Sequence, residues 1–233
     1  MKLKMLCSAL AGASLLLSAC GGSDGSSAAA PTKNVLFFLG DGMGITTMTA
    51  ARIYSVGEDG ELTMDKLPET AFVHTFSNDA QVTDSAPSMA AYMTGVKMNN
   101  EVISMSAETL AYAANGQQYI NGEDTTCPAG NGQPAQTLLE LSKAKGRAVG
   151  AISTTRVGHA TPAATYAHIC NRNGYNSIAE QSVPGHANYN AKLGDGIDVL
   201  MGGGQRNYLP KSVNPSSKMT RPPAISESPS MYQ

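Results

Sequence analysis

Charged residues are few in this chain, and the two signs nearly cancel. Lys and Arg total 16 and Asp and Glu total 18, which leaves a formal net charge of -2 over 233 residues. This balance predicts no basic surface for nucleic acid and no acidic tail, so any anionic ligand must be held by a local site. The hydrophobic fraction of 42% is ordinary for a globular protein, and the length allows one large α/β domain or two small ones.

The apolar run near the N-terminus is too short to span a bilayer. It covers residues 5–17, follows two lysines and ends in small residues, which predicts an export signal over residues 1–20. The ending LLSAC resembles the lipobox of bacterial lipoproteins, in which the cysteine becomes the lipidated first residue; a plain signal peptide cut nearby is the alternative. The resemblance implies export and attachment to a bacterial membrane through lipid on Cys20, facing the periplasm or the cell exterior. Residues 21–33, rich in Gly, Ser and Ala, would then be a flexible tether.

Cysteine is also scarce, with four residues in the whole chain. Cys7 lies within the export signal and Cys20 would carry lipid, which leaves Cys127 and Cys170 as a pair in an oxidising compartment. We predict that these two form a disulfide. Two separate buried thiols are the alternative, because the sequence does not give the Cα distance that a disulfide requires.

Strand-like and helix-like segments alternate between residues 34 and 210. Apolar runs predict strands at 34–39, 70–76, 147–153 and 197–201. Helical patterns predict helices at 46–55, 88–94 and 133–145, with Gly146 closing the last. The alternation favours an α/β fold with a doubly wound, mostly parallel sheet flanked by helices. Residues 99–133 are expected to be a surface excursion carrying Cys127, and residues 211–233, rich in Ser and Pro, a disordered tail.

The first predicted strand leads into FLGDGMG, which places Asp41 among three glycines. Ligands of open α/β sheets bind beyond the carboxyl ends of the strands, so Asp41 is a candidate metal ligand. An aspartate that only completes a turn is the alternative. The glycine spacing is not a dinucleotide fingerprint, and no P-loop lysine follows it.

Ser85, in VTDSAPSMAAYMTG, precedes an Ala-Pro step and a run of small residues. Local sequence favours a helix N-cap, whose hydroxyl accepts a backbone N–H. The same helix start presents free N–H groups and the positive end of the helix dipole, which favour a phosphate. Taken alone, this stretch leaves both a cap and a nucleophile open.

Three segments, in this order, resemble the alkaline phosphatase family: NVLFFLGDGMG, VTDSAPSMAAYMTGVK and ISTTRVGHATPAATYAHICNRN. Together with DVLMGGG they cover most of residues 34–209. The resemblance implies hydrolysis of phosphomonoesters through a phosphoserine, with two zinc ions and magnesium in the site and a homodimer as in the family.

The metal-binding residues of the family carry over only where this sequence matches. Ser85 would attack the phosphorus and also ligate a zinc ion, and Asp41 would link that zinc to the magnesium. Thr161 would be a magnesium ligand. His159 lies where some members place a histidine near that ion through water.

The resemblance also implies a phosphate-binding arginine. Arg172 would grip two phosphate oxygens with its planar guanidinium, and Asp84 would orient it. The remaining histidines are poor zinc candidates and are expected in core or surface roles. They are His74 in a strand, His168 in a helix and His186 in a loop.

Two features depart from the family pattern. Pro87 stands where the family has alanine, and sulfatases build formylglycine from a Cys or Ser two positions before a proline; their motif also needs an arginine where this chain has Met89. A sulfatase-like hydrolase is therefore a minor alternative.

Family members are considerably longer, and the ligands of their C-terminal half have no recognisable match after Arg172. Residues 34–210 are thus expected to be the N-terminal part of the fold with little activity alone. A tethered lipoprotein that binds phosphate or a partner without catalysis is the other alternative.

Overall fold

The computed structural model describes residues 34–209. The expected export signal (1–20), tether (21–33) and tail (211–233) lie outside the described residues. The chain divides after Gly40 into two units, and residues 34–40 are the described part of the first. Among residues 34–209, none of the helices has both the length and the apolar character needed to cross a bilayer.

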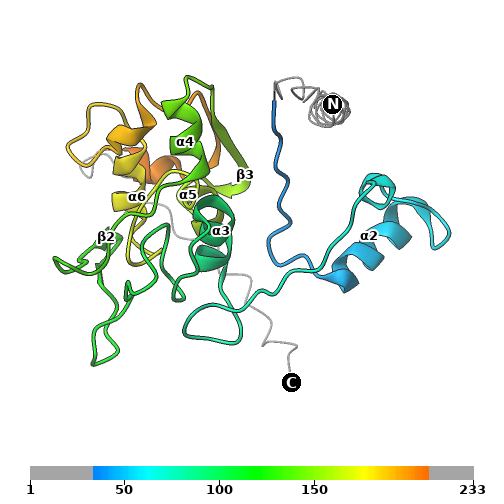
Figure 1. Cartoon of the computed structure of the whole chain (residues 1–233), viewed down its shortest axis with the longest axis horizontal. Helices are drawn as coiled ribbons and strands as arrows, with labels where there is room; N and C mark the ends of the chain where they lie inside the picture. Colours follow the sequence, from blue (N-terminus) through cyan, green and yellow to red (C-terminus); the bar gives the residue numbers. More distant parts are fainter. Residues whose placement is uncertain (1–33, 210–233) are drawn as a thin grey trace, which may run out of the picture. The chain divides into compact units, whose positions relative to one another are not determined.

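Five α-helices and three short 3-10 helices are found between residues 41 and 209 (Figure 1). The α-helices are α2 (Ile45–Val56), α3 (Ser85–Thr94), α4 (Leu138–Ala144), α5 (Ala160–Ala163) and α6 (Tyr175–Gln181). The 3-10 helices are η2 (Thr63–Lys66), η3 (Ala191–Leu193) and η4 (Gln205–Tyr208). The predicted helices at 46–55 and 88–94 are confirmed as α2 and α3.

The helix expected from residue 133 begins later, because a capping box fixes its start at α4. The Thr137 hydroxyl accepts the backbone N–H of Glu140, and the Glu140 carboxylate accepts the backbone N–H of Thr137. Residues 133–135 are instead held against the segment around Ser104, since Ala135 N–H donates to the Ser104 carbonyl. Gly146, with a positive φ of 67°, follows the helix as predicted.

Two of the four predicted strands form a parallel pair. Strand β3 (Gly150–Arg156) pairs with β4 (Val199–Gly203) in a register that matches Gly150 with Val199 and Arg156 with Gly203. A second pair, β1 (Ile120–Asn121) and β2 (Asp124–Thr125), is antiparallel. A Cβ added at Gly202 would lie 2.8 Å from the Thr155 carbonyl oxygen, so the β3–β4 contact requires glycine there. Helices with a small parallel sheet form part of the α/β fold that the sequence predicts.

The predicted strands at 34–39 and 70–76 are wrong for this structure. Neither segment pairs with any strand in the described part of the chain. Phe38 is 88% exposed and Phe72 is 90% exposed, although both segments are strongly apolar. A fully apolar strand is stable only when neighbours on both sides supply hydrogen bonds and cover its faces, so the pattern alone does not make a strand.

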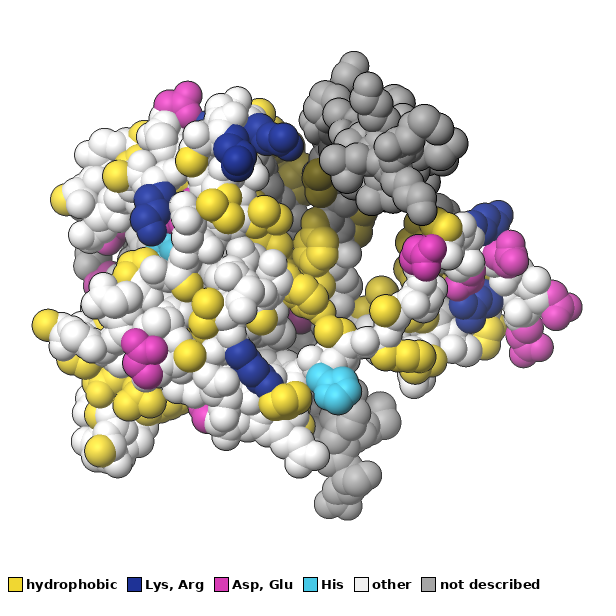
Figure 2. All heavy atoms as spheres, viewed as in Figure 1, with side chains coloured by type: hydrophobic (Ala, Val, Ile, Leu, Met, Phe, Trp, Pro, Cys, Tyr) yellow, Lys and Arg dark blue, Asp and Glu magenta, His cyan; other side chains and the backbone are white. Residues whose placement is uncertain are grey.

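The core lies where α3 packs against α5 (Figure 1). Small side chains such as Ala90 and Ala160, both fully buried, let the two helices approach closely. Val102 and Ile103 are also fully buried, so the surface excursion expected at residues 99–133 is wrong for its first part. That part crosses the core because Ile103 forms an antiparallel bridge with Ile169. Outside the core, hydrophobic side chains remain visible in several places on the surface (Figure 2).

The predicted disulfide is confirmed between Cys127 and Cys170. Their Cα atoms are 5.9 Å apart, and the bond closes a loop with a sequence separation of 43 residues. A crosslink of this loop length stabilises the folded chain by roughly 4 kcal/mol in the chain-entropy account. It also fixes the segment that leads into Arg172.

Candidate active site

The first residue of α3 is Ser85, and its hydroxyl is not the cap of that helix. Asp84 occupies the N-cap position with extended backbone angles, and among the described residues no side chain caps α3. The Ser85 Oγ instead accepts a hydrogen bond from Arg172 Nη1 at 2.9 Å. The N-cap alternative is therefore wrong. The hydroxyl instead faces the Arg172 guanidinium, at the positive end of the dipole of a ten-residue helix.

Arg172 joins the predicted phosphate-binding residues into one cluster. Its Nη1 donates to Asp84 Oδ2 at 2.6 Å as well as to Ser85, and the Arg172 side chain is only 14% exposed. The distance between its Nη2 and His159 Nε2 is 3.2 Å. A half-buried ion pair of this kind fixes the plane of the guanidinium, which is what bidentate recognition of a phosphate requires.

His159 is held as a neutral ring beside this cluster. Burial lowers its pKa, and the positive charge of Arg172 lowers it further. Because the guanidinium can only donate, Nε2 must be the acceptor and the ring proton is on Nδ1. That Nδ1 is buried without a hydrogen-bond partner among the described residues.

The two other predicted metal ligands form a separate pair. Thr161 Oγ1, in the first turn of α5, donates to Asp41 Oδ2 at 2.7 Å. Both are oxygen donors of the kind that a hard cation such as magnesium prefers. Within residues 34–209 no group of three or more His, Cys, Asp or Glu side chains is arranged to hold a metal ion. The described residues therefore fit part of a magnesium site, but they do not provide the three protein ligands of a catalytic zinc.

Glu101 belongs to the cluster, and sequence reasoning missed it. Its backbone N–H donates to Asp84 Oδ1 at 3.1 Å, and its carbonyl accepts the backbone N–H of Arg172 at 2.8 Å. The Glu101 carboxylate accepts from Asn173 Nδ2 at 3.3 Å. These contacts depend on a positive φ of 70°, which is uncommon for a glutamate and has no signature in the sequence.

The remaining histidines lie outside this cluster. His168 is not in a helix as predicted; it follows α5 in an irregular segment, because the Ile103–Ile169 bridge extends the chain there. Its expected core role is confirmed, since its ring contacts the Ser104 carbonyl and the Glu140 carboxylate. His74 is exposed and outside any strand, and His186 lies in a loop as predicted.

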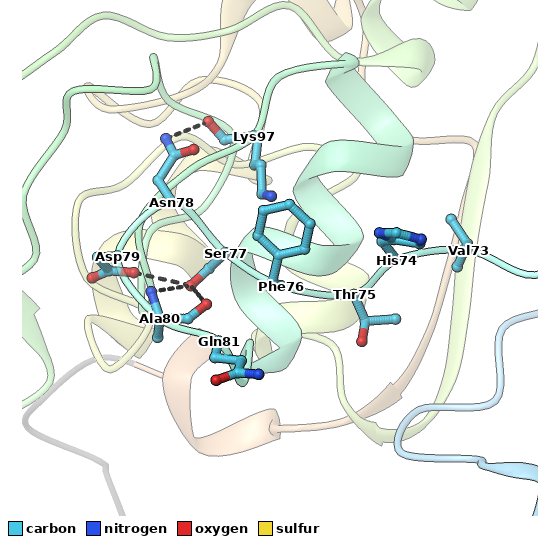
Figure 3. Close-up of a pocket in the computed structure, with 10 residues that line it drawn as sticks. All are labelled: Val73, His74, Thr75, Phe76, Ser77, Asn78, Asp79, Ala80, Gln81 and Lys97. Atoms are coloured by element: carbon cyan, nitrogen blue, oxygen red, sulfur yellow. Dashed lines mark hydrogen bonds between the residues drawn. The ribbon is translucent and has the colours of Figure 1, made fainter.

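A shallow hollow of about 790 Å³ lies apart from these residues and is lined by residues 73–81 and Lys97 (Figure 3). The Lys97 ammonium lies over the Phe76 ring. None of the predicted catalytic or metal-binding residues lines the hollow. The candidate active site is therefore the partly buried Ser85–Arg172 cluster at the start of α3.

Residues 32–222 match the family model described as alkaline phosphatase. The chain belongs to the alkaline phosphatase family. The mouse tissue-nonspecific isozyme is 38% identical over 195 residues, covering 77% of this chain and 34% of that protein. The alkaline phosphatase of the cod Gadus morhua is 38% identical over 193 residues, covering 78% of this chain and 38% of that protein. This chain thus spans about a third of the length of the curated alkaline phosphatases that it matches.

Solved alkaline phosphatases share the fold. The cold-active enzyme from a psychrophilic Shewanella has a TM-score of 0.51 at 29% identity, covering 73% of this chain and 36% of that one. The enzyme from the Antarctic bacterium TAB5 has a TM-score of 0.53 at 21% identity, covering 72% of this chain and 39% of that one. A structure of a TAB5 mutant has magnesium bound in its M3 site. Family membership, with Met89 in place of an arginine, disfavours the sulfatase-like alternative.

Proposed function

We propose that this chain carries the nucleophile and the phosphate-binding group of an alkaline phosphatase that hydrolyses phosphomonoesters through a phosphoserine at Ser85. The observation that carries the proposal is the 2.9 Å contact between Ser85 Oγ and Arg172 Nη1. The position at the start of a helix does not by itself require a serine to contact a half-buried guanidinium. Family membership supports the same reaction.

The chemistry follows from this contact. Ser85 Oγ loses its proton to solvent and attacks the phosphorus, so that a new O–P bond forms as the ester P–O bond breaks. The ester oxygen leaves with the electron pair and takes a proton from water to become the alcohol. Water then attacks the phosphoserine, the Ser85 O–P bond breaks, and phosphate and the serine hydroxyl are regenerated. Arg172 donates to the non-bridging oxygens, where the negative charge gathers during transfer. Asp84 and the Glu101 carbonyl keep Arg172 in place during both steps, through its guanidinium and its backbone N–H.

Zinc and magnesium are part of the proposal. Asp41 and Thr161 would hold magnesium through their oxygens, and the ion when bound would supply positive charge for phosphoryl transfer. The zinc ligands beyond Asp41 and Ser85 would come from polypeptide outside residues 34–209. The homodimer implied by the family resemblance stays a prediction.

A phosphate- or partner-binding protein without catalysis is the second candidate function. It is favoured by one observation, namely that residues 34–209 hold no group of three or more His, Cys, Asp or Glu side chains placed for a metal. Such a protein would bind phosphate at Arg172 and form no phosphoserine.

Labelling of Ser85 is the experiment that separates these two functions. The chain is mixed with the C-terminal portion of a full-length alkaline phosphatase, exposed to labelled phosphate at acidic pH, and mapped by peptide. We expect label on the peptide that contains Ser85, and none in Ser85→Ala. Ser88→Ala, one turn later in the same helix, is the matched control and should label normally. Label on another residue, with Ser85→Ala fully labelled, would contradict the proposed nucleophile.

We also propose that Cys20 carries lipid and anchors the protein to a bacterial membrane. The LLSAC ending and the Gly/Ser/Ala-rich residues 21–33 support this. The intact mass of protein from the membrane fraction should show acyl chains on an N-terminal cysteine. Recovery of a soluble product that begins after Cys20 would count against it.

A further inference from the structure

Glu101 closes a ring of contacts around the phosphate-binding arginine. Its N–H holds one oxygen of the Asp84 carboxylate while Arg172 Nη1 holds the other, and the Glu101 carbonyl holds the Arg172 backbone. The positive φ of Glu101 turns its N–H toward Asp84 and its carbonyl toward the backbone of Arg172. The backbone of Glu101 thus fixes Asp84 and Arg172, and the Glu101 side chain takes no part in these contacts.

The Glu101 side chain adds a second carboxylate to the cluster, where it accepts from Asn173 next to Arg172. Asp84 already neutralises Arg172 through the 2.6 Å contact. With Glu101 ionised, Arg172, Asp84 and Glu101 together carry one more negative charge than positive charge. Burial and the negative charge of Asp84 raise the pKa of Glu101, whereas Arg172 opposes this, so the carboxylate is electrostatically coupled to both.

We propose that the Glu101 carboxylate weakens the binding of phosphate at Arg172 and so favours the release of phosphate from the site. The inference rests on the proposed function, because it assumes that phosphate binds at Ser85 and Arg172. A phosphate dianion there meets the net negative charge of Arg172, Asp84 and Glu101 taken together, and repulsion within a partly buried site is weakly screened. Removing the Glu101 charge should therefore tighten phosphate binding.

The test measures the affinity of the full 233-residue chain for inorganic phosphate at pH 8 and constant ionic strength. The amide signals of Ser85 and Arg172 are followed by NMR during the titration. Glu101→Gln keeps the length of the side chain and an oxygen for Asn173 but removes the charge. Its Kd should be about ten-fold lower than that of the unmodified chain, and the difference should shrink as salt is added.

Two controls accompany this test. One asks whether the effect comes from Glu101 and not from the net charge of the chain, and the other asks whether phosphate binds at Arg172. Glu108→Gln removes an equal charge from an exposed side chain and should leave the Kd unchanged. Arg172→Ala should abolish the response of the Ser85 amide to phosphate. The role of Glu101 would be overturned if the Kd of Glu101→Gln were equal to or higher than that of the unmodified chain while Arg172→Ala showed no response to phosphate. The proposed function would still stand in that case. No response in either the unmodified chain or Glu101→Gln, or a response that survives in Arg172→Ala, would overturn the phosphate site and the proposed function with it.

Discussion

The 233-residue chain, purified without any other polypeptide, is expected to hydrolyse no chromogenic phosphomonoester at a measurable rate and to bind zinc poorly. Phosphoryl transfer is accelerated mainly by positioned charge on the attacking and leaving oxygens. Arg172 supplies one guanidinium, already paired with Asp84. Residues 34–209 contain no group of three or more His, Cys, Asp or Glu side chains that could hold a metal, and a catalytic zinc needs about three protein ligands.

The measurement combines turnover with metal content. Zinc per chain is determined after dialysis, and turnover is compared with that of a full-length alkaline phosphatase under the same conditions. Adding the C-terminal portion of such an enzyme should restore some turnover, and the same mixture made with Ser85→Ala should stay inactive. Two zinc ions per chain, with turnover near that of the full-length enzyme, would show that the ligands are present in this chain and that we have not recognised them.

Low solubility is expected to accompany low activity. The β3–β4 pair leaves apolar side chains on its surface, with Ile152 72% exposed and Met201 58% exposed. Exposed apolar surface and unpaired strand edges are sites of self-association. The titrations therefore need dilute protein and a check of the aggregation state.

Replacing Glu140 is expected to cause a large loss of stability in this chain. Its side chain is fully buried and receives hydrogen bonds from His168 at 2.7 Å and Asn190 at 2.7 Å, besides the Thr137 N–H. Glu140→Ala would leave the Thr137 N–H, the Asn190 amide and the facing His168 nitrogen without this acceptor. A buried group left without its hydrogen-bond partner costs about 1–3 kcal/mol.

The Glu140 carboxylate also makes stability depend on pH. Burial would raise its pKa, but the hydrogen bonds from His168 and Asn190 outweigh this and lower the pKa to about 2, from an ordinary value of 4.5. A lowered folded-state pKa stabilises the protein above the unfolded-state value, and this stabilisation, about 3 kcal/mol, is lost as the pH falls from about 4.5 toward 2.

Urea denaturation at pH 7 and pH 3 tests both expectations for Glu140. The unmodified chain should lose more free energy of unfolding between these two pH values than Glu140→Gln, which has no carboxyl group to protonate. Glu140→Ala should already be destabilised at pH 7. Equal losses on acidification in the unmodified chain and in Glu140→Gln would show that this carboxylate does not control acid stability.

The local parts of the fold could be predicted from the sequence, and the parts that depend on partners could not. Helices α2 and α3 follow from patterns within a few residues, and Ser85 stands out because its motif is contiguous. The apolar residues 34–39 predict a strand but do not specify which neighbour pairs with them. In the described chain they pair with none, so Phe38 remains exposed.

The site shows the same division between local and long-range information. Asp84 and Ser85 are neighbours in sequence, and their family motif indicates Arg172 as the partner. Glu101 enters the site only through a left-handed backbone conformation and a long-range contact with the Arg172 backbone, and neither is encoded in a short motif. Residue type alone would have placed Glu101 on a solvated surface.

The Cys127–Cys170 bond ties the anion site to a distant part of the chain. Cys170 is two residues before Arg172, so the bond fastens the arginine-bearing segment to the chain around β2. Under reducing conditions the same segment would be held by the packing of Ile169 in the core and by hydrogen bonds, such as those between Ile103 and Ile169 and between Glu101 and Arg172. The position of Arg172 therefore depends on the redox state of two cysteines that are not themselves part of the anion site.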